Sequence, residues 1–501
     1  MPEELFEAGD DQSLSPAPPA GKKDKKTKDP ARMGTERIGK LLFEFSLPAV
    51  VMMLVNSLYN VIDTAVLGYA VGPEGVAVTT LALPIMQLLM GFSMWAGQGG
   101  SALAAIQMGA GERDKVEKTL GNTTFLLFAL AAAMAVVAIV FIDPVLSIIG
   151  TTSTLWEQTK IFVQIICFGT VFQSLTGGLN AFLRTAGKPN LSLGMSLLGT
   201  VACIVLNVLF VVVMGFGVAG SALATILGQA CGGIPVIVYF IFAKSSPFHL
   251  YAANLKPQGA VVRKILSLGL ASFIIQTAST LVSVVLNQVV NVWGATDPIG
   301  VDNGLAAIGV AQKGAVFGLM PILGVTMGAQ PIVGFNYGAR SWDRVIKTLK
   351  WSIITCTVMG AVYWLAARLF AVPIVNILGI TDPQLEAFAS EALMLYALFY
   401  PLVGAQIMAG SYFQSSGQPL KASILELVRQ VIFLMPLYLF MPGVLQGAFG
   451  IGSLMSVVWC APISDIMAVC VTTVFTVMEV VKLVGLRRNA LQEQARVQTQ
   501  S

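Results

Sequence analysis

The sequence predicts an all-α integral membrane protein in which twelve transmembrane helices form two pseudo-symmetric six-helix lobes. Three observations lead to this fold class: an apolar composition, twelve long apolar segments and an internal repeat. Hydrophobic residues make up 55% of the 501-residue chain and charged residues only 11%, whereas soluble domains carry about 25% charged residues. The composition therefore excludes an ordinary soluble protein.

Twelve segments are long enough, at about 20 residues or more, to cross the hydrocarbon core of a bilayer. They cover residues 42–69, 76–109, 118–142, 157–184, 190–214, 218–243, 263–294, 303–338, 344–370, 385–415, 420–442 and 448–483. Because the number of spans is even, we expect both termini on the same side of the membrane.

Charge in the connectors predicts which side that is. Basic residues such as Arg113, Lys188 and Arg340 fall in every second connector, and acidic residues dominate the others. Because basic loops stay in the cytoplasm, we expect a multi-pass protein of the cell (inner) membrane with both termini cytoplasmic. Residues 1–36 are polar and lack the apolar core of a signal peptide. We interpret them as a disordered cytoplasmic tail and residues 486–501 as a second cytoplasmic tail.

The two halves of the chain resemble each other. GERDKVEKTL at 111–120 is similar to GARSWDRVIKTL at 338–349, and LRTAGKP at 183–189 is similar to FQSSGQP at 413–419, an offset of about 230 residues. We expect an N-lobe at 37–243 and a C-lobe at 263–485, joined by a cytoplasmic loop at 244–262. Transporters built from such parallel repeats bind substrate near mid-membrane, where the halves meet.

Ionisable residues inside membrane spans are costly and point to function. Asp63 lies in the first span, and Asn60 and Asp63 are predicted on one helix face with Tyr59 one turn away. Cys203 and Asn207 in the fifth span and Thr225 in the sixth complete a candidate coupling site for a proton or a sodium ion. The alternatives are that Asp63 lies at the outer end of its span and contacts water, and that Asn207 makes an ordinary interhelical hydrogen bond.

The second half carries its own polar group. Glu426 and Arg429 are three residues apart in the eleventh span, and Asp465 follows in the twelfth. A buried arginine needs a counter-ion, so we expect Arg429 to pair with Asp465 or Glu426. A pair that fixes helix packing and a gating role remain equally open. Lys313, in the eighth span, is expected to extend toward the membrane surface.

Several spans near the expected lobe interface are rich in methionine, aromatic and amide side chains, which suit adaptable contacts with organic cations. The candidate substrate-cavity residues are Tyr59, Met90, Met94, Trp95, Gln98, Phe317, Met320 and Gln330. The alternative for each is packing or lipid contact.

Other functional classes find little support. The chain has one histidine and six cysteines without CxxC spacing, so we expect no catalytic residues, no cofactor and no bound metal other than a possible Na⁺ at Asp63. No GxxxxGK[ST] motif for ATP occurs. The net charge of +4 is small, and nucleic acid is not an expected partner.

Four stretches carry a resemblance to a known family. FSLPAVVMMLVNSLYNVIDTAVLG in the first span, LRTAGKPNLS before the fifth, GAQPIVGFNYGA in the eighth and LVRQVIFLMPLYLFMP in the eleventh resemble multidrug and toxic compound extrusion (MATE) transporters. The resemblance covers about residues 37 to 485, and the second half looks most like the MepA-like/DinF-like prokaryotic branch.

This resemblance implies a twelve-helix antiporter that exports cationic amphipathic compounds, including drugs, in exchange for protons or sodium. Asp63 matches the first-span aspartate that serves as the family's cation site. Asn207 stands where prokaryotic relatives often have aspartate, and Cys203 where they often have asparagine, which favours protons over sodium modestly. Export or flipping of a lipid-linked or other endogenous metabolite is the alternative. We expect a monomer in the lipid bilayer, with organic cations and H⁺ or Na⁺ as partners.

Overall fold

The structure, a computed structural model, describes residues 30–149, 151, 154–380 and 382–500, and every regular element in these ranges is a helix. The first half contains α1 (Arg32–Thr35), α2 (Ile38–Ala70), α3 (Pro73–Gly109), α4 (Arg113–Val140), α5 (Ile142–Ile149), α6 (Trp156–Ser174), η1 (Leu175–Leu179), α7 (Asn180–Thr185), α8 (Pro189–Asn207), η2 (Val208–Val213) and α9 (Gly217–Phe242). Among these, η1 and η2 are π-helical turns that continue the helices before them.

The second half begins with the short 3₁₀ turn η3 (Ala252–Leu255). It continues with α10 (Gly259–Gly294), α11 (Val301–Gly338), α12 (Trp342–Ile377), α13 (Pro383–Tyr396), α14 (Tyr400–Ser415), α15 (Pro419–Leu427), the π-helical η4 (Val428–Leu434), α16 (Met435–Phe449) and α17 (Ser453–Gln500).

The described residues contain eleven helices long and apolar enough to cross a membrane, and twelve spans if the bent pair α13 and α14 counts as one. The all-helical membrane fold predicted from the apolar segments is therefore confirmed. The tenth span is bent by 48° between α13 and α14. Pro401 in the first turn of α14 explains the break, because proline lacks an N–H and clashes with the preceding turn.

Most span boundaries differ from the sequence prediction by a few residues, and those of the last span differ most. The twelfth span begins at Ser453 rather than at 448, because Phe449 still belongs to α16 and Gly450 ends that helix with a left-handed φ of 66°. The same span also continues to Gln500, so the predicted tail at 486–501 is an extension of α17 as far as it is described. The 48 residues of α17 are about 72 Å long at the α-helical rise.

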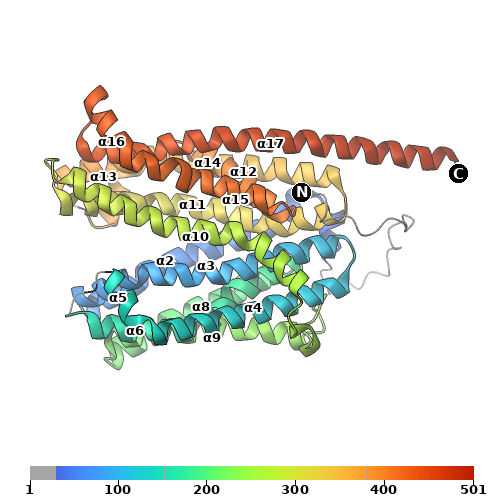
Figure 1. Cartoon of the computed structure of the whole chain (residues 1–501), viewed down its shortest axis with the longest axis horizontal. Coiled ribbons are helices and arrows are strands. Elements are labelled where there is room, and N and C mark those ends of the chain that lie inside the picture. Colours follow the sequence, from blue (N-terminus) through green and yellow to red (C-terminus); the bar gives the residue numbers. More distant parts are fainter. Residues whose placement is uncertain (1–29, 150, 152–153, 381, 501) are drawn as a thin grey trace.

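The helices form two groups in Figure 1, with α2 to α9 in one and α10 to α17 in the other. We keep the names N-lobe and C-lobe for these groups. The end where α17 finishes carries the connectors with Arg113, Lys188 and Arg340, and we call it the basic side. The opposite end, with α5 and the start of α13, is the acidic side.

Residues 30–36 were predicted to be part of a disordered tail, but in the structure they include α1 and pack on the C-lobe. Residues 1–29 lie outside the described part of the chain. Met33 is 1% exposed and packs beside Phe335 of α11. Asn336 and Arg344 of the C-lobe both donate hydrogen bonds to the Met33 carbonyl, at 2.9 and 2.8 Å. The segment before the first helix of the N-lobe is thus held on the C-lobe.

An ion-pair group stabilises this segment. Arg32 Nε lies 2.6 Å from Glu36 Oε1, and Arg32 Nη2 lies 2.9 Å from Glu44 Oε2. The hydrogen bond from Arg32 lowers the pKa of the Glu36 carboxyl below its ordinary value. The sequence did not predict this ion-pair group, because one arginine and two carboxylates in a polar stretch form no distinctive pattern.

The lobes contact each other through glycines toward the basic side. A Cβ added at Gly324 of α11 would lie 2.5 Å from Val50 Cα of α2, and one at Gly328 would lie 2.6 Å from Ser46 Cα. On the other helix pair, a Cβ at Gly99 of α3 would lie 2.0 Å from the Ile265 carbonyl oxygen of α10. Only glycine allows backbones to approach so closely, as in other membrane helix pairs.

Toward the acidic side the same helix faces are exposed. Thr64 follows Ser46 on α2 by 18 residues, which is five helical turns and hence the same direction, and it is exposed. On α10, Asn287 stands five turns after Gly269, which packs on the Trp95 backbone, and it is exposed too. Figure 1 shows the two groups diverging toward this end. The lobes are therefore packed closely together on the basic side, whereas their facing residues are exposed toward the acidic side.

Candidate functional site

Asp63 of α2 lies inside the N-lobe against α8 and α9. Its Oδ1 accepts a hydrogen bond from Asn207 Nδ2 and a second one, at 3.2 Å, from Ser221 Oγ. Asn207 and Ser221 are each 1% exposed. A carboxylate held by two neutral donors, with no Lys or Arg ion pair among the described residues, is a group that a proton or a cation can neutralise.

A second polar contact lies beside Asp63 on the same helices. The Tyr59 hydroxyl is 3.1 Å from Thr225 Oγ1, and Cys203 Sγ donates to the Thr225 carbonyl at 3.6 Å. Cys203 is buried because Gly228 of α9 leaves room for it: a Cβ there would lie 2.1 Å from Cys203 Sγ. Four residues proposed for the coupling site, together with Tyr59 from the cavity set, thus meet between α2, α8 and α9.

Asn60 does not join this group. It is exposed, and its Nδ2 donates to the Asn56 carbonyl of its own helix at 3.1 Å. Residues three apart on an α-helix point about 60° apart. Because of this difference, Asp63 faces the interior of the N-lobe while Asn60 is directed toward its exposed surface. Ser221 was missed, although it lies one turn before Thr225 on α9, and this i, i+4 pairing was visible in the sequence.

The unpaired Oδ1 of Asn207 is the remaining polar atom near Asp63. It is buried and has no hydrogen-bond partner among the described residues. The oxygens of Asp63, Asn207 and Ser221 are of the hard type that Na⁺ prefers, but only one of them is charged. No cluster of three or more His, Cys, Asp or Glu side chains that could hold a metal is found in the described ranges.

Each lobe has a π-helical turn beside its polar group. In the N-lobe η2 starts directly after Asn207, and in the C-lobe η4 contains Arg429. Their first residues, Val208 and Val428, are 220 positions apart, close to the repeat offset. Such turns are rare in α-helices and occur often at functional sites.

Arg429 in the C-lobe pairs with Asp465, as expected. Arg429 Nε lies 3.1 Å from Asp465 Oδ1, and the two side chains are 22% and 9% exposed. Ser464 Oγ donates to the Arg429 carbonyl at 3.0 Å and fixes α17 to η4. Glu426 extends toward α14, where its Oε1 lies 2.9 Å from the position of a Cβ on Gly410. This group lies within the C-lobe rather than between the lobes.

Trp95 lies in the contact between the lobes. Its Nε1 donates to the Leu266 carbonyl of α10 at 2.7 Å, and its ring stacks on Phe273 with centroids 4.7 Å apart. Nearer to the acidic side than Trp95, Gln276 of α10 donates a 2.5 Å hydrogen bond to Gln87 of α3. Trp95 therefore forms part of the close contact between the lobes.

The other cavity candidates are scattered. Phe317 and Met320 are partly exposed on α11, Gln330 is partly exposed nearer its basic end, Met90 and Met94 of α3 are exposed and partly exposed, and Gln98 is buried. Phe317 and Met320 lie seven and four residues before Gly324, on the side of α11 that faces the N-lobe. These two are thus brought to the interlobe space.

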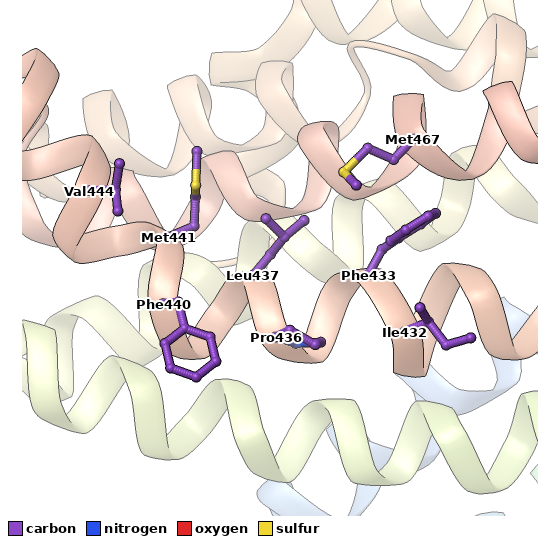
Figure 2. Close-up of a pocket in the computed structure, with 8 residues that line it drawn as sticks. All are labelled: Ile432, Phe433, Pro436, Leu437, Phe440, Met441, Val444 and Met467. Carbon is purple, nitrogen blue, oxygen red and sulfur yellow. The ribbon is translucent and has the colours of Figure 1, made fainter.

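A separate apolar pocket of about 270 Å³ lies between η4, α16 and α17. Figure 2 shows Met467 of α17 opposite Phe433 and Leu437, with Phe440 and Pro436 farther from it. It is lined by Ile432, Phe433, Pro436, Leu437, Phe440, Met441, Val444 and Met467. None of these is a coupling or cavity candidate, and the pocket offers no group that binds an ion.

Comparison with known proteins connects this architecture to a family. The MatE family model matches residues 48–209 and 271–439. The chain is 24% identical over 432 residues to multidrug export protein MepA of Staphylococcus haemolyticus (strain JCSC1435), which covers 85% of this chain and 91% of that protein. It is 23% identical over 390 residues to the probable multidrug resistance protein YoeA of Bacillus subtilis (strain 168), covering 76% and 82%.

A solved structure described as the outward-facing conformation of a multidrug resistance MATE family transporter has the same fold. Its TM-score is 0.83 at 21% identity, over 92% of this chain and all of the solved chain. The two matched segments of the family model together span more than half of the 501 residues, with one in each lobe.

Proposed function

We propose, on the premise that this chain belongs to the MatE family of multi-pass membrane transporters, that it is an ion-coupled antiporter. It exports organic, mainly cationic amphipathic compounds, including drugs, across the cell membrane by alternating access. The basic side faces the cytoplasm, as the positive-inside rule requires. The chain is a transporter and not an enzyme.

The observation that carries the proposal is the position of α2. One face of this helix holds Asp63 against Asn207 and Ser221 inside the N-lobe. Another face packs Ser46 and Val50 on Gly328 and Gly324 of α11. A change at Asp63 that moves α2 therefore changes the contact that closes the basic side.

The ion step follows from charge. When Asp63 is ionised, it accepts from Asn207 and Ser221, and loss of its charge to a proton weakens both hydrogen bonds. The α2 segment around Asp63 is then free to shift and to favour the conformation that opens toward the cytoplasm. Coupling requires that the ion bind the two conformations with different affinity. Because Asp63 is the single carboxylate of this group, we favour H⁺ over Na⁺.

The test uses proteoliposomes with separately imposed proton and sodium gradients and follows transport of ethidium. We expect a proton gradient to drive transport by the native protein and Asp63→Asn to abolish it, since the amide is nearly isosteric but cannot change charge. Asp302→Asn serves as the matched control, because Asp302 is exposed at the acidic end of α11. Normal gradient-driven transport by Asp63→Asn would remove Asp63 from the mechanism.

A further inference from the structure

Lys313 lies on the face of α11 that looks toward the N-lobe. It precedes Gly324 by 11 residues, so the two point within about 20° of each other on an α-helix. Gly324 packs directly on Val50 of α2. The opposite face of α11 is buried in the C-lobe, where Gly314 faces Leu393 and Gly318 faces Tyr363. Lys313 therefore points away from its own lobe.

The lysine is exposed and has no counter-ion. No carboxylate of the described residues lies within 4.0 Å of its amine, and no hydrogen bond to it is found there. Ala306 and Val316, on either side of it along the same stripe, are exposed as well. The stripe thus continues the face of α11 that packs on α2 at Gly324, and it is exposed where it passes Lys313.

An unpaired cation in a membrane span is costly unless it faces water or a polar partner. Toward the acidic side the exposed polar side chains of α2 and α10 are neutral, among them Asn60, Thr64, Ser283 and Asn287. The carboxylate of Asp63, on the same stretch of α2, is turned into the N-lobe, where it accepts from Asn207 and Ser221. None of the exposed groups can neutralise an ammonium group. An anionic group on a bound compound would therefore complement the charge of this surface.

Lys313 also has apolar neighbours on its own face. Phe317 and Met320 follow it by four and seven residues, which places all three side chains in one row, and both are partly exposed. An aromatic ring and an adaptable thioether suit the flat apolar body of an organic compound. The row ends at Gly324, where the lobes close.

We propose that Lys313, Phe317 and Met320 form a substrate subsite that binds the carboxylate and adjoining apolar body of zwitterionic amphipathic compounds. This rests on the proposed export function and narrows its substrate class. The carboxylate pairs with the Lys313 amine, and the ring system lies on Phe317 and Met320. The exposed polar groups of the N-lobe are neutral, so they do not repel the cationic end of the compound.

The experiment compares two fluorescent dyes that differ in one group. Rhodamine 110 carries a free carboxylate, and rhodamine 123 is its methyl ester. Transport into proteoliposomes and binding to the purified protein, followed by fluorescence anisotropy, are measured for the native protein and for Lys313→Gln, Lys313→Arg and Lys313→Glu. Lys350→Gln, at an exposed lysine on the basic side, removes the same charge at a remote position.

We expect the native protein to bind rhodamine 110 more tightly than rhodamine 123. Lys313→Gln weakens binding of rhodamine 110 by about tenfold or more, because a charge-assisted contact is lost, and leaves rhodamine 123 unchanged. Lys313→Arg keeps the preference, Lys313→Glu reverses it, and Lys350→Gln matches the native protein. Melting curves of the purified variants confirm that each is folded.

Two results would overturn the subsite. The first is that Lys313→Gln changes both dyes equally or neither. The second is that the native protein binds only the ester. If the native protein binds rhodamine 110 through Lys313 but transports neither dye under any gradient, the proposed export function fails while the subsite stands.

Discussion

Replacing Gly324 by alanine is expected to weaken the closed contact on the basic side. The added Cβ would lie 2.5 Å from Val50 Cα and 2.6 Å from Val50 N. Ordinary van der Waals contacts begin at 3.4 Å, so the shortfall is 3.4 − 2.5 = 0.9 Å. The atoms it meets belong mainly to the backbone of α2, which cannot rotate away as the end of a long side chain would.

The cost of this overlap sets the size of the effect. Overpacking a close contact costs about 1–3 kcal/mol, which corresponds to a change of about 5- to 150-fold in an equilibrium constant. The strain exists only in the conformation that closes the basic side, so that conformation loses population to the one in which the lobes separate there. Gly309→Ala is the matched control, because Gly309 lies on the same helix with nothing within 4 Å of a Cβ.

The assay is a distance measurement between spin labels at Tyr69 and Ile377, which lie at the acidic end of each lobe and are 87% and 85% exposed. The exposed Cys231 and Cys470 are first replaced by serine. Gly324→Ala should shift the distribution toward shorter distances, whereas Gly309→Ala should match the native protein. Identical distributions for both variants would refute the idea that the Gly324 contact holds this conformation.

Two further predictions concern groups outside the interlobe contact. Asp465→Asn removes the carboxylate that pairs with the partly buried Arg429 and should destabilise the detergent-solubilised protein by about 3 kcal/mol, the lower end of the range for a broken buried pair. Arg429→Met with Asp465→Leu should recover most of the loss. Melting curves measure both, and an unchanged melt for the single variant would contradict the pairing. Arg344→Ala removes the donors to the Met33 and Glu36 carbonyls. Hydrogen exchange in residues 30–37 should then become faster, while the lobes stay folded. Unchanged exchange in this segment would show that these hydrogen bonds do not hold it.

The sequence predicted the spans well because each is a long apolar run, and apolar length alone decides whether a helix crosses a bilayer. It did not predict the bend before Pro401, since proline is tolerated in many membrane helices and also lies inside α11 at Pro321 and Pro331 without ending it. The order of residues 30–36 was missed for another reason. Met33 is buried by Phe335, about 300 residues away, and no local pattern reports such a contact.

The candidate site was predictable in part. Polar residues inside membrane spans are costly, and this cost alone selected Asp63, Asn207 and Thr225 as candidates from three different spans. Spacing could not tell which face of α2 meets the N-lobe interior and which meets α11, and this is why Asn60 was grouped with Asp63. Trp95 shows the same limit, since an aromatic residue at a lobe interface lines a cavity in one conformation and closes it in another.

The position of Lys313 bears on how substrate and ion exchange could be linked. Lys313 on α11 and Asp63 on α2 lie on the two helices that Gly324 and Val50 bring together. A bound zwitterion would neutralise Lys313 only while the acidic side is open, whereas a proton would neutralise Asp63 from within the N-lobe. Each event changes the charge on one side of the same helix pair. Substrate binding at Lys313 and protonation of Asp63 can therefore shift α2 in opposite ways without any direct contact between substrate and ion. This link predicts that Lys313→Gln alters substrate preference but leaves the requirement for Asp63 intact.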